Sequence, residues 1–468
     1  MSQRVKYIIP LAVLFIFWFL PAPEGLSTNA WHFLAIFFAV VVGLVIEPVP
    51  AALIGFTGIS LVALLGLMGP SSKENISWAL SGFSNSVIWL IFAAFMFALG
   101  YKKTGLGRRV SLIMIKYMGK STLGLGYAVA FSDLVLAPFM PSNTARSAGS
   151  VFPVAINIPQ IFDSYPDKDP RKIGSYISWV AIATTCITSS MFLTALAPNL
   201  LAVDLIAKGT GHAISWGEWA SVMLPLMVPL FLLTPWLTYV VYPPTQKSSP
   251  EAPAWASEEL KKLGSVTPKE YLMAGLATVA LVLWIFGKEF GVHSTTVAIS
   301  IVSIMILTNV INWDDVISNK AAFNVLIWFS SLVAMAAGLK KVGILEWIGN
   351  NTEATLSGMT PITLMLSLII IFFLLHYFFA SVTAHVTALI PIFMAMAVNL
   401  LTPEQLVPFT VIMAGSLGVM GIITPYATGP SPIWYGAGYI TQARWWALGA
   451  LFGAIYLGTI IIGALIFI

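Results

Sequence analysis

The stretch MPSNTARSAG, residues 140–149, places a polar cluster inside one of the most apolar regions of the chain. Ser142, Asn143 and Thr144 are uncharged, and Arg146 follows two residues later. The apolar segment around them, about residues 121–161, is roughly twice as long as the ~20 residues that a helix needs to cross a bilayer. We therefore expect this segment to enter the membrane, break at the polar cluster and return to the same side.

Composition assigns the whole chain to the membrane. Hydrophobic residues make up 58% of the 468 residues and charged residues 9%, whereas soluble domains carry about 25% charged residues. The sequence predicts an all-α polytopic membrane protein with about 11 transmembrane helices and two re-entrant hairpins. The expected spans are 7–23, 31–47, 51–69, 86–101, 174–207, 220–242, 269–287, 293–311, 321–339, 407–426 and 441–467. The second hairpin is expected at about 359–400.

Charge and cysteine content narrow the function. A net charge of +4 does not suggest a nucleic-acid partner, and the single cysteine, Cys186, excludes a disulfide framework and a cysteine-based metal site. With the N-terminus inside, seventeen lysines and arginines fall in inside loops and five in outside loops, Lys288 among the latter. This asymmetry predicts a multi-pass protein of a bacterial-type cytoplasmic membrane, with its C-terminus outside. Residues 244–268 form the one long hydrophilic connection.

The two halves of the chain repeat one another. NSVIWLIFAAFMFALGYKKTG (85–105) resembles NVLIWFSSLVAMAAGLKKVG (324–343), and at the same offset SNTAR (142–146) aligns with SVTAH (381–385). The flanks of the first hairpin are basic and those of the second are not, so the two hairpins should enter from opposite faces. Inverted repeats of this kind are typical of secondary transporters.

Both hairpin motifs carry the chemistry of an anion site. A helix N-terminus inside the membrane presents N–H donors and a positive partial charge, to which serine, threonine and asparagine add short donors. Two such sites facing each other would suit an anion with two negative ends, such as a dicarboxylate. The alternative is that these residues only cap the two half-helices.

A second pair of breaks lies in crossing helices, at TALAPN (194–199) and TPYATGPSPIWYG (424–436). Unwound turns there would line the same cavity, or they are simple proline kinks. The predicted substrate contacts of both pairs together are Ser142, Asn143, Thr144, Ser381, Val382, Thr383, Thr428, Pro198 and Asn199.

These motifs and the inverted halves resemble the divalent anion:sodium symporter family, the INDY-type dicarboxylate and citrate transporters. The resemblance implies a homodimer in which transport domains slide against fixed scaffolds, an elevator mechanism, with substrate between the hairpin tips and no cofactor. On this basis residues 1–115 and 215–345, which include the cytoplasmic linker 244–268, are expected to form the scaffold. Residues 116–214 and 346–468 are expected to form the transport domain.

One departure from the sodium-coupled pattern is informative. Val382 stands where the second motif would carry an asparagine, and Arg146 and His385 follow the two motif threonines at equivalent positions. A guanidinium and a protonatable imidazole would supply positive charge in place of sodium. This pattern resembles the exchanger branch of the family. Alternatively, Arg146 bonds hairpin carbonyls, extends its side chain toward the membrane surface or pairs with Asp133, and His385 stays neutral. His376, in the same hairpin outside the motif, is interpreted as structural.

The resemblance and the motifs together predict sodium-independent exchange of dicarboxylates such as 2-oxoglutarate, malate, succinate and fumarate. If the empty carrier keeps unbalanced positive charge, only the loaded form should cross easily. A sodium-coupled dicarboxylate or citrate symporter is the alternative, since Asn143 is present in the first motif. An enzyme is disfavoured because no paired carboxylates, HExxH or Ser/His/Asp set occurs, and a channel because opposed hairpins suit occlusion.

Overall fold

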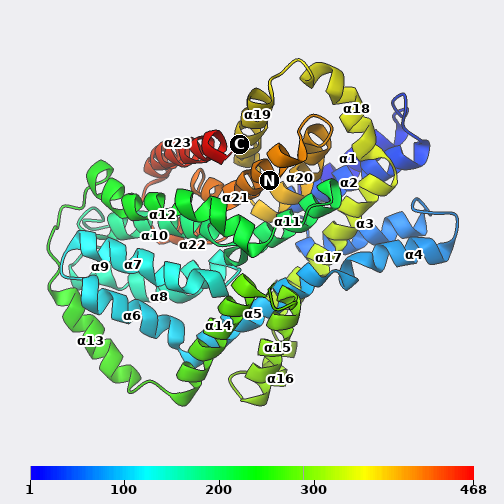
Figure 1. The fold of residues 1–468 in the computed structure, drawn as a ribbon. Coiled ribbons are helices and arrows are strands. Elements are labelled where there is room, and N and C mark those ends of the chain that lie inside the picture. Colours follow the sequence, from blue (N-terminus) through cyan, green and yellow to red (C-terminus); the bar gives the residue numbers. More distant parts are fainter. Residues whose placement is uncertain (1, 288, 468) are drawn as a thin grey trace.

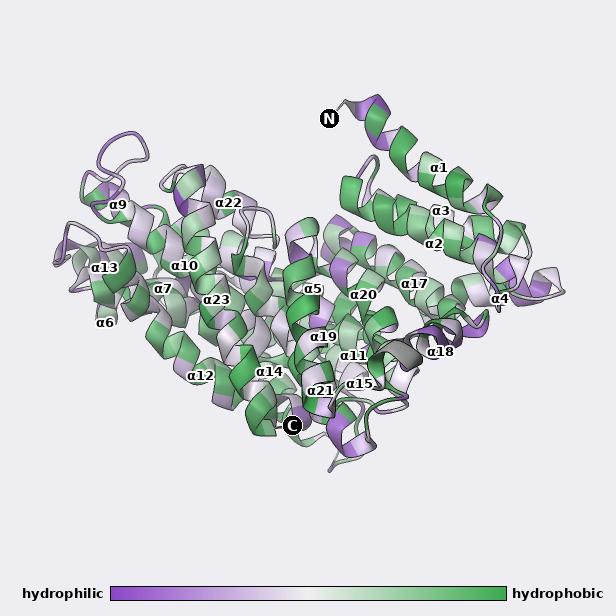
Figure 2. Cartoon of the chain, turned by 90° about the horizontal axis from the view of Figure 1, so that it is seen from above, coloured by the Kyte–Doolittle hydropathy of each residue, from purple (hydrophilic) through white to green (hydrophobic). Residues whose placement is uncertain are grey.

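The computed structural model describes residues 2–287 and 289–467, and within them the chain is helical with no β-strand (Figure 1). Lys288, predicted to face the outside, lies outside the described residues. Apolar residues cover the long helices, while hydrophilic residues gather in loops and in short helices such as α4 (Ser72–Leu80) (Figure 2). The predicted multi-pass helical architecture is confirmed.

Nine helices in the described part are long and apolar enough to cross a membrane. Six are single helices: α2 (Thr28–Ile46), α5 (Ser86–Thr104), α12 (Trp216–Val241), α14 (Pro268–Phe286), α17 (Lys320–Lys341) and α23 (Gln442–Phe467). Three continue into a short 3₁₀ turn: α7–η2 (Thr122–Phe139), α19–η5 (Pro361–Phe378) and α21–η6 (Pro403–Ile422). Shorter apolar helices are α3 (Ala51–Leu64), α15 (Ser294–Leu307) and α20 (Val382–Ala397). Helix α1 (Gln3–Phe19) precedes them near the N-terminus.

The repeat detected in the sequence reappears as repeated elements. In each half a long helix, α5 or α17, is followed by an amphipathic one, α6 (Leu106–Met118) or α18 (Ile344–Leu356). Gly105 and Gly343 begin these amphipathic helices with φ of 78° and 81°. Residues that have a side chain rarely adopt this left-handed backbone conformation, which explains why both repeats have glycine at this position. Each half also ends in a helix of 26 residues, α12 or α23.

Both interrupted apolar segments are helical hairpins. In the first, α7 and η2 (Ala137–Phe139) lead to a turn, and the return arm consists of η3 (Thr144–Val151), α8 (Phe152–Ala155) and α9 (Ile158–Ile161). In the second, α19 and η5 (His376–Phe378) lead to a turn and α20 returns. The element η3 is a π-helix, a rare geometry that is frequently found at functional sites.

The predicted breaks in the crossing helices are also present. The first separates α10 (Gly174–Met191), η4 (Leu193–Ala195) and α11 (Ala197–Thr210). The second separates α21 (Pro403–Val419) and η6 (Met420–Ile422) from α22 (Ser431–Gly436). Each break therefore leaves backbone groups without helical partners in the middle of the bundle, where lipid cannot satisfy them.

The hydrophilic connection 244–268 is more ordered than its composition indicated. It contains α13 (Glu251–Leu263), which packs against α6. Arg108 on α6 forms an ion pair with Glu259 at 2.7 Å, and Arg109 forms a buried one with Glu270 at 2.5 Å. The remaining short elements are η1 (Ser81–Ser84) and α16 (Trp313–Ile317).

Packing divides the bundle into two apolar clusters. The smaller contains α1–α4 and the second half of α17, and the larger contains both hairpins and both broken helices. Helix α12 packs against α10, α21 and α23, although our expected domain boundary assigned it to the scaffold. Because of these contacts, we place α12 with the broken helices in the proposed transport domain.

Candidate functional site

A cavity of about 310 Å³ lies where the two hairpin tips meet the two broken helices. Its volume is at the lower end of the range of small-molecule sites, about 300–1,000 Å³. Eight of the nine predicted substrate contacts line it: Ser142, Asn143, Thr144, Pro198, Ser381, Val382, Thr383 and Thr428. The structure thus brings four separate stretches of the chain together around one space.

The two motif serines cap the half-helices that begin at this cavity. The Ser142 hydroxyl accepts a hydrogen bond from the Ala145 N–H at 3.2 Å, and the Ser381 hydroxyl accepts one from the Ala384 N–H at 3.3 Å. The capping interpretation therefore holds for both serines, although both also line the cavity. Two helix N-termini converging on one space give it the positive potential and free donors that an anion requires.

The first hairpin tip is tied directly to the second broken helix. The Asn143 side-chain N–H donates to the Thr428 hydroxyl oxygen at 2.7 Å, and both side chains are buried. Because a hydroxyl has one donor and two acceptor positions, Thr428 keeps its own O–H for a ligand in the cavity. Asn143 therefore orients Thr428 rather than leaving it free to rotate.

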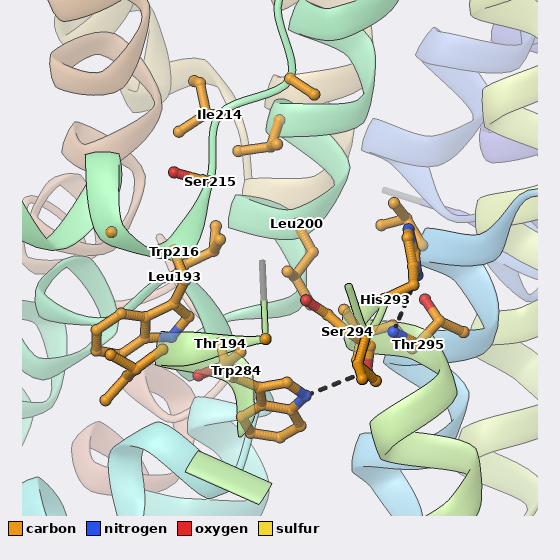
Figure 3. A pocket seen from close by; sticks show the side chains of 18 of the residues that line it. Leu193, Thr194, Leu200, Ile214, Ser215, Trp216, Trp284, His293, Ser294 and Thr295 are labelled. Atoms are coloured by element: carbon orange, nitrogen blue, oxygen red, sulfur yellow. Dashed lines mark hydrogen bonds between the residues drawn. The ribbon is translucent and has the colours of Figure 1, made fainter. Parts of the chain in front are cut away.

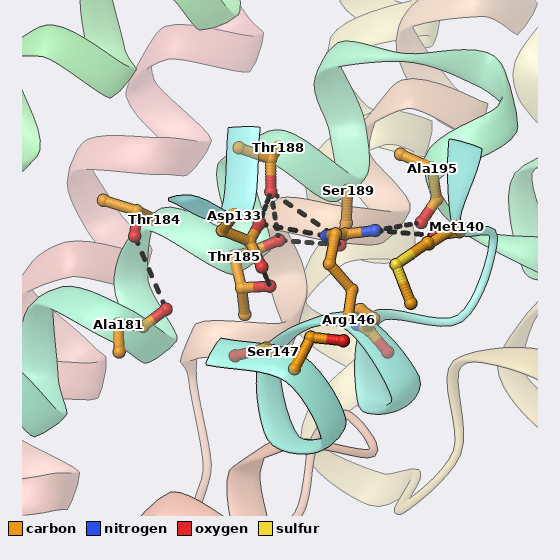
Figure 4. A network of polar contacts seen from close by, with 12 residues as sticks. Asp133, Met140, Arg146, Ser147, Ala181, Thr184, Thr185, Thr188, Ser189 and Ala195 are labelled. Carbon is orange, nitrogen blue, oxygen red and sulfur yellow. Dashed lines mark hydrogen bonds and ion pairs between the residues drawn. The ribbon is translucent and has the colours of Figure 1, made fainter. Parts of the chain in front are cut away.

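Arg146 does not line the cavity; it lies fully buried behind the first tip (Figure 4). Its Nη1 donates to the Met140 carbonyl at 2.9 Å and to the Ala195 carbonyl at 2.8 Å. Its Nη2 donates to the Thr188 and Ser189 hydroxyls at 3.3 and 3.0 Å. The guanidinium thus joins the hairpin tip to the break at η4.

Asp133 on α7 supplies the counter-charge of Arg146. Arg146 Nε donates to the Asp133 carboxylate at 3.0 Å, which uses the last of the five guanidinium N–H groups. Thr185 and Thr188 donate to the same carboxylate. The sequence left this pairing open, and the structure forms it. Our inference that the empty carrier holds an unbalanced charge at Arg146 is therefore corrected: a carboxylate balances it.

His385 is also buried and also lies off the cavity lining. Its ring packs against Phe372, Phe379 and His376, and neither ring nitrogen has a hydrogen-bond partner among the described residues. The Nε2 of His376 is 2.8 Å from the Ala427 carbonyl, in the second break. His376 therefore ties the second hairpin to the second break, much as Arg146 ties the first hairpin to the first break.

Asn199 is the predicted contact that lies away from the cavity. Its side-chain N–H donates to the Ser189 carbonyl at 2.8 Å and to the Phe192 carbonyl at 3.4 Å. These carbonyls lose their helical partners where α10 ends, so Asn199 satisfies the break instead of facing a ligand. We no longer include it among the expected substrate contacts.

Sequence reasoning missed the wall of the cavity opposite the motifs. It consists of Glu47, Phe95, Val325, Trp328 and Phe329, from the α2–α3 turn, α5 and α17. The Trp328 indole N–H has no acceptor among the described residues. The repeat had paired Trp328 with Trp89, but a repeated tryptophan alone does not indicate a cavity. Phe95, Val325 and Phe329 also lie in the repeated segments, where apolar residues do not indicate a cavity, and Glu47 belongs to no motif.

A larger cavity, of about 710 Å³, lies between α5, the start of α11, the start of α12 and the α14–α15 turn (Figure 3). Side chains such as Leu90, Leu200 and Trp284 make its lining mostly apolar. Trp284 donates to the Ser294 carbonyl at 3.2 Å. None of the predicted site residues reaches this cavity, so the smaller cavity between the hairpin tips is the candidate substrate site.

Comparison with known proteins supports the whole-chain resemblance. A family model described as the sodium:sulfate symporter transmembrane region matches residues 1–467. L-tartrate/succinate antiporters of Escherichia coli (strain K12) and Shigella flexneri are each 48% identical over 98% of this chain and 97% of theirs. These relatives are antiporters, which agrees with the prediction that the chain is not an enzyme.

Two solved structures share the fold at low sequence identity. The Alcanivorax borkumensis YdaH transporter has a TM-score of 0.58 and 14% identity, covering 89% of this chain and 97% of its own. Neisseria gonorrhoeae MtrF has a TM-score of 0.57 and 13% identity, covering 92% and 97%. At such identities the likeness concerns the architecture alone.

Proposed function

Because the chain belongs to the divalent anion:sodium symporter family, we propose that it is a secondary transporter that exchanges small dicarboxylates across the cytoplasmic membrane without sodium. Succinate and L-tartrate are the first candidates, since the relatives at 48% identity are L-tartrate/succinate antiporters. Malate, fumarate and 2-oxoglutarate have the same two carboxylates and fall within the proposal.

The observation that carries the proposal is the cavity between the hairpin tips. The N-termini of η3 and α20 face it from two sides, with Thr144, Thr383 and Thr428 beside them. A dianion offers one carboxylate to each helix N-terminus, and each carboxylate accepts several hydrogen bonds. A monocarboxylate would leave one set of donors unpaired inside the protein, which costs binding free energy.

Arg146 supports independence from sodium. In a sodium-coupled carrier, a bound cation holds carbonyl oxygens of unwound segments; here Arg146 bonds the Met140 and Ala195 carbonyls of two such segments. Arg146 is part of the chain, and Asp133 balances its charge. Unlike a bound sodium ion, this positive group does not have to be taken up from solution and does not leave with the substrate. The role of His385 in the second hairpin is proposed by analogy of position alone.

The same geometry gives a reason for exchange rather than net transport. Without substrate, the donors at the cavity that the protein does not pair, such as the Thr428 hydroxyl, have only water as partner. Carrying them past the apolar wall formed by Phe95, Val325 and Phe329 would strip that water and leave the donors unsatisfied. A bound dianion satisfies them, so the loaded carrier crosses more easily than the empty one.

We further propose that the transport is of the elevator type, in a homodimer, with the N-terminus in the cytoplasm. The moving body would be the two hairpins, the broken helices, α12 and α23. The fixed body would be α1–α5, α14, α15 and α17. One polar contact between these bodies is the bond from the Asn85 side chain to the Asp204 carboxylate at 2.8 Å, which must break when the bodies slide.

The first experiment is uptake of labelled succinate into proteoliposomes, with or without internal tartrate, in sodium and in choline buffer. We expect uptake only with internal dicarboxylate, and at the same rate in both buffers. Uptake into empty vesicles that requires a sodium gradient would identify a symporter and overturn the proposal. Vesicles without protein and a monocarboxylate substrate are the controls.

A single substitution probes the second motif. Val382→Asn restores the asparagine that the sodium-coupled pattern carries, but we expect exchange to remain independent of sodium. The reason is that Arg146 continues to hold the two unwound segments. Exchange rates of the variant across a series of sodium concentrations test this expectation. Sodium-stimulated transport by Val382→Asn would show that the arginine does not replace the cation.

A further inference from the structure

Glu47 faces the candidate dianion site although it carries the same sign of charge as the substrate. It lies in the turn between α2 and α3 and lines the cavity from the side opposite the hairpin motifs. Of the described residues that line this cavity, no other carries a charge. Its side chain is exposed, and its carboxylate forms no hydrogen bond or ion pair among the described residues. An unpaired carboxylate at an anion site requires an explanation.

The backbone at Glu47 is also unusual. Its φ of 49° and ψ of 61° lie in the left-handed region, which residues other than glycine seldom adopt. Its N–H closes α2 by donating to the Gly43 carbonyl at 2.8 Å, and Pro48 follows directly. Unfavourable backbone conformations that persist are concentrated at functional sites. The turn therefore presents the carboxylate from a constrained position.

We propose that Glu47 is a release-promoting residue, which lowers the affinity of the site for a dianion only while the site faces the end of the bundle that carries the N-terminus. This inference rests on the proposed exchange and on the proposed elevator movement. The Gln3 side chain bonds the Pro48 carbonyl at 2.7 Å, so Glu47 and the N-terminus lie at the same end. Because Glu47 belongs to the fixed body, the site meets its negative charge in one facing state and leaves it in the other.

The physical basis is repulsion between like charges. The Glu47 carboxylate and the two charges of a dianion repel one another across the cavity, and the repulsion is moderate because the carboxylate is exposed to water. The N-termini of η3 and α20 attract the dianion in both facing states, because they move with the site. Glu47 adds its repulsion at one end alone, so it speeds dissociation there without weakening capture at the opposite end.

The test is Glu47→Gln, with half-saturating succinate concentrations measured separately on the two sides of oriented proteoliposomes. We expect the concentration on the N-terminal side to fall by about three- to tenfold at low ionic strength, and the value on the other side to stay unchanged. The difference should shrink in high salt, because the carboxylate is exposed and salt screens it. A structural role would not produce this dependence on salt and side.

Two variants control for shape and for charge elsewhere. Glu47→Asp keeps the charge and should behave like the wild type. Glu24→Gln removes another exposed carboxylate, from the α1–α2 loop, which does not line the cavity. Unchanged, raised or equally lowered half-saturation on both sides in Glu47→Gln overturns the role of Glu47. Absence of succinate exchange by the wild type instead overturns the proposed function, and with it this inference.

Discussion

Replacing Arg146 with alanine is expected to abolish dicarboxylate exchange and to destabilise the protein. The substitution removes all five hydrogen bonds of a guanidinium that is 0% exposed and leaves the buried Asp133 carboxyl group without its ion-pair partner. Breaking a buried ion pair by deleting one partner costs about 3–5 kcal/mol. Arg146→Lys should not restore transport, because one ammonium has three donors and lacks the planar geometry that reaches two carbonyls and a carboxylate together.

A double variant separates stability from transport. Replacing the pair by apolar residues of similar size, Asp133→Leu with Arg146→Met, leaves no buried charge, and such exchanges are often neutral for stability. The double variant should therefore fold but still fail to exchange succinate, since nothing holds the Met140 and Ala195 carbonyls together. Size-exclusion profiles and thermal unfolding in detergent report the fold, and counterflow in proteoliposomes reports exchange.

Arg108 provides the matched control for this experiment. Its side chain is 54% exposed and pairs with Glu259 at the surface, where ion pairs contribute about 0–1 kcal/mol. Arg108→Ala should leave exchange and stability close to wild type. If Arg146→Ala or the apolar double variant exchanges succinate at the wild-type rate, the guanidinium does not organise the site, and the proposed replacement of sodium must be abandoned.

Much of the architecture was predictable because a helix that crosses a membrane needs an uninterrupted run of about 20 apolar residues, and such runs are visible in a sequence. The hairpins were predictable for the same reason: segments twice the length of a span, with a polar interruption, have few other solutions. The convergence of SNT, SVT and Thr428 followed from the repeat, since equivalent breaks in inverted halves must meet near the midplane. The family assignment is likewise confirmed.

Amphipathic helices escaped prediction because they are not apolar runs. Helices α6, α13 and α18 are amphipathic, with an apolar face and a polar face. A search for long apolar runs therefore assigns these segments to loops. Helix α12 was predicted as a span, but its packing against α10, α21 and α23 was not, because a sequence shows where a helix is and not what it packs against.

At the site, too, the residues of the motifs could be predicted from the sequence, whereas their hydrogen-bond partners could not. The motifs identified which residues reach the cavity, but the partners of Arg146 come from four places: α7, the turn of the first hairpin, α10 and η4. No local pattern relates Asp133 to Arg146 across a hairpin bend. Glu47 could not be predicted for a different reason. It belongs to the proposed fixed body, and no motif in its own segment indicates an anion site.

Gly429→Ala adds only one methyl group, but we expect it to weaken substrate binding strongly. Gly429 lies beside Thr428 and lines the cavity. A Cβ atom added there would lie 1.9 Å from the Thr144 hydroxyl oxygen and 3.2 Å from the Thr144 Cβ. The first distance is far inside van der Waals contact, so either Thr144 changes rotamer or the first hairpin tip retreats.

Both responses damage the proposed dianion site. A rotated Thr144 withdraws its hydroxyl from the cavity, and a retreating tip stretches the 2.7 Å bond between Asn143 and Thr428. Overpacking of this kind costs about 1–3 kcal/mol, which corresponds to roughly a 5- to 150-fold loss of affinity if it is all lost from binding. Half-saturating succinate concentrations in counterflow should therefore rise by at least about fivefold.

Gly436→Ala is the matched control, because a Cβ at the end of α22 meets nothing within 4 Å. It should exchange succinate like the wild type, which would show that an added methyl group is tolerated elsewhere in the same segment. Combining Gly429→Ala with Thr144→Ala removes the overlap and should bring back the Asn143–Thr428 contact, recovering part of the affinity. Wild-type affinity in Gly429→Ala would mean that substrate does not depend on the close approach of Thr144 to the second break. The anion site would then have to be sought away from the junction between the first hairpin tip and that break.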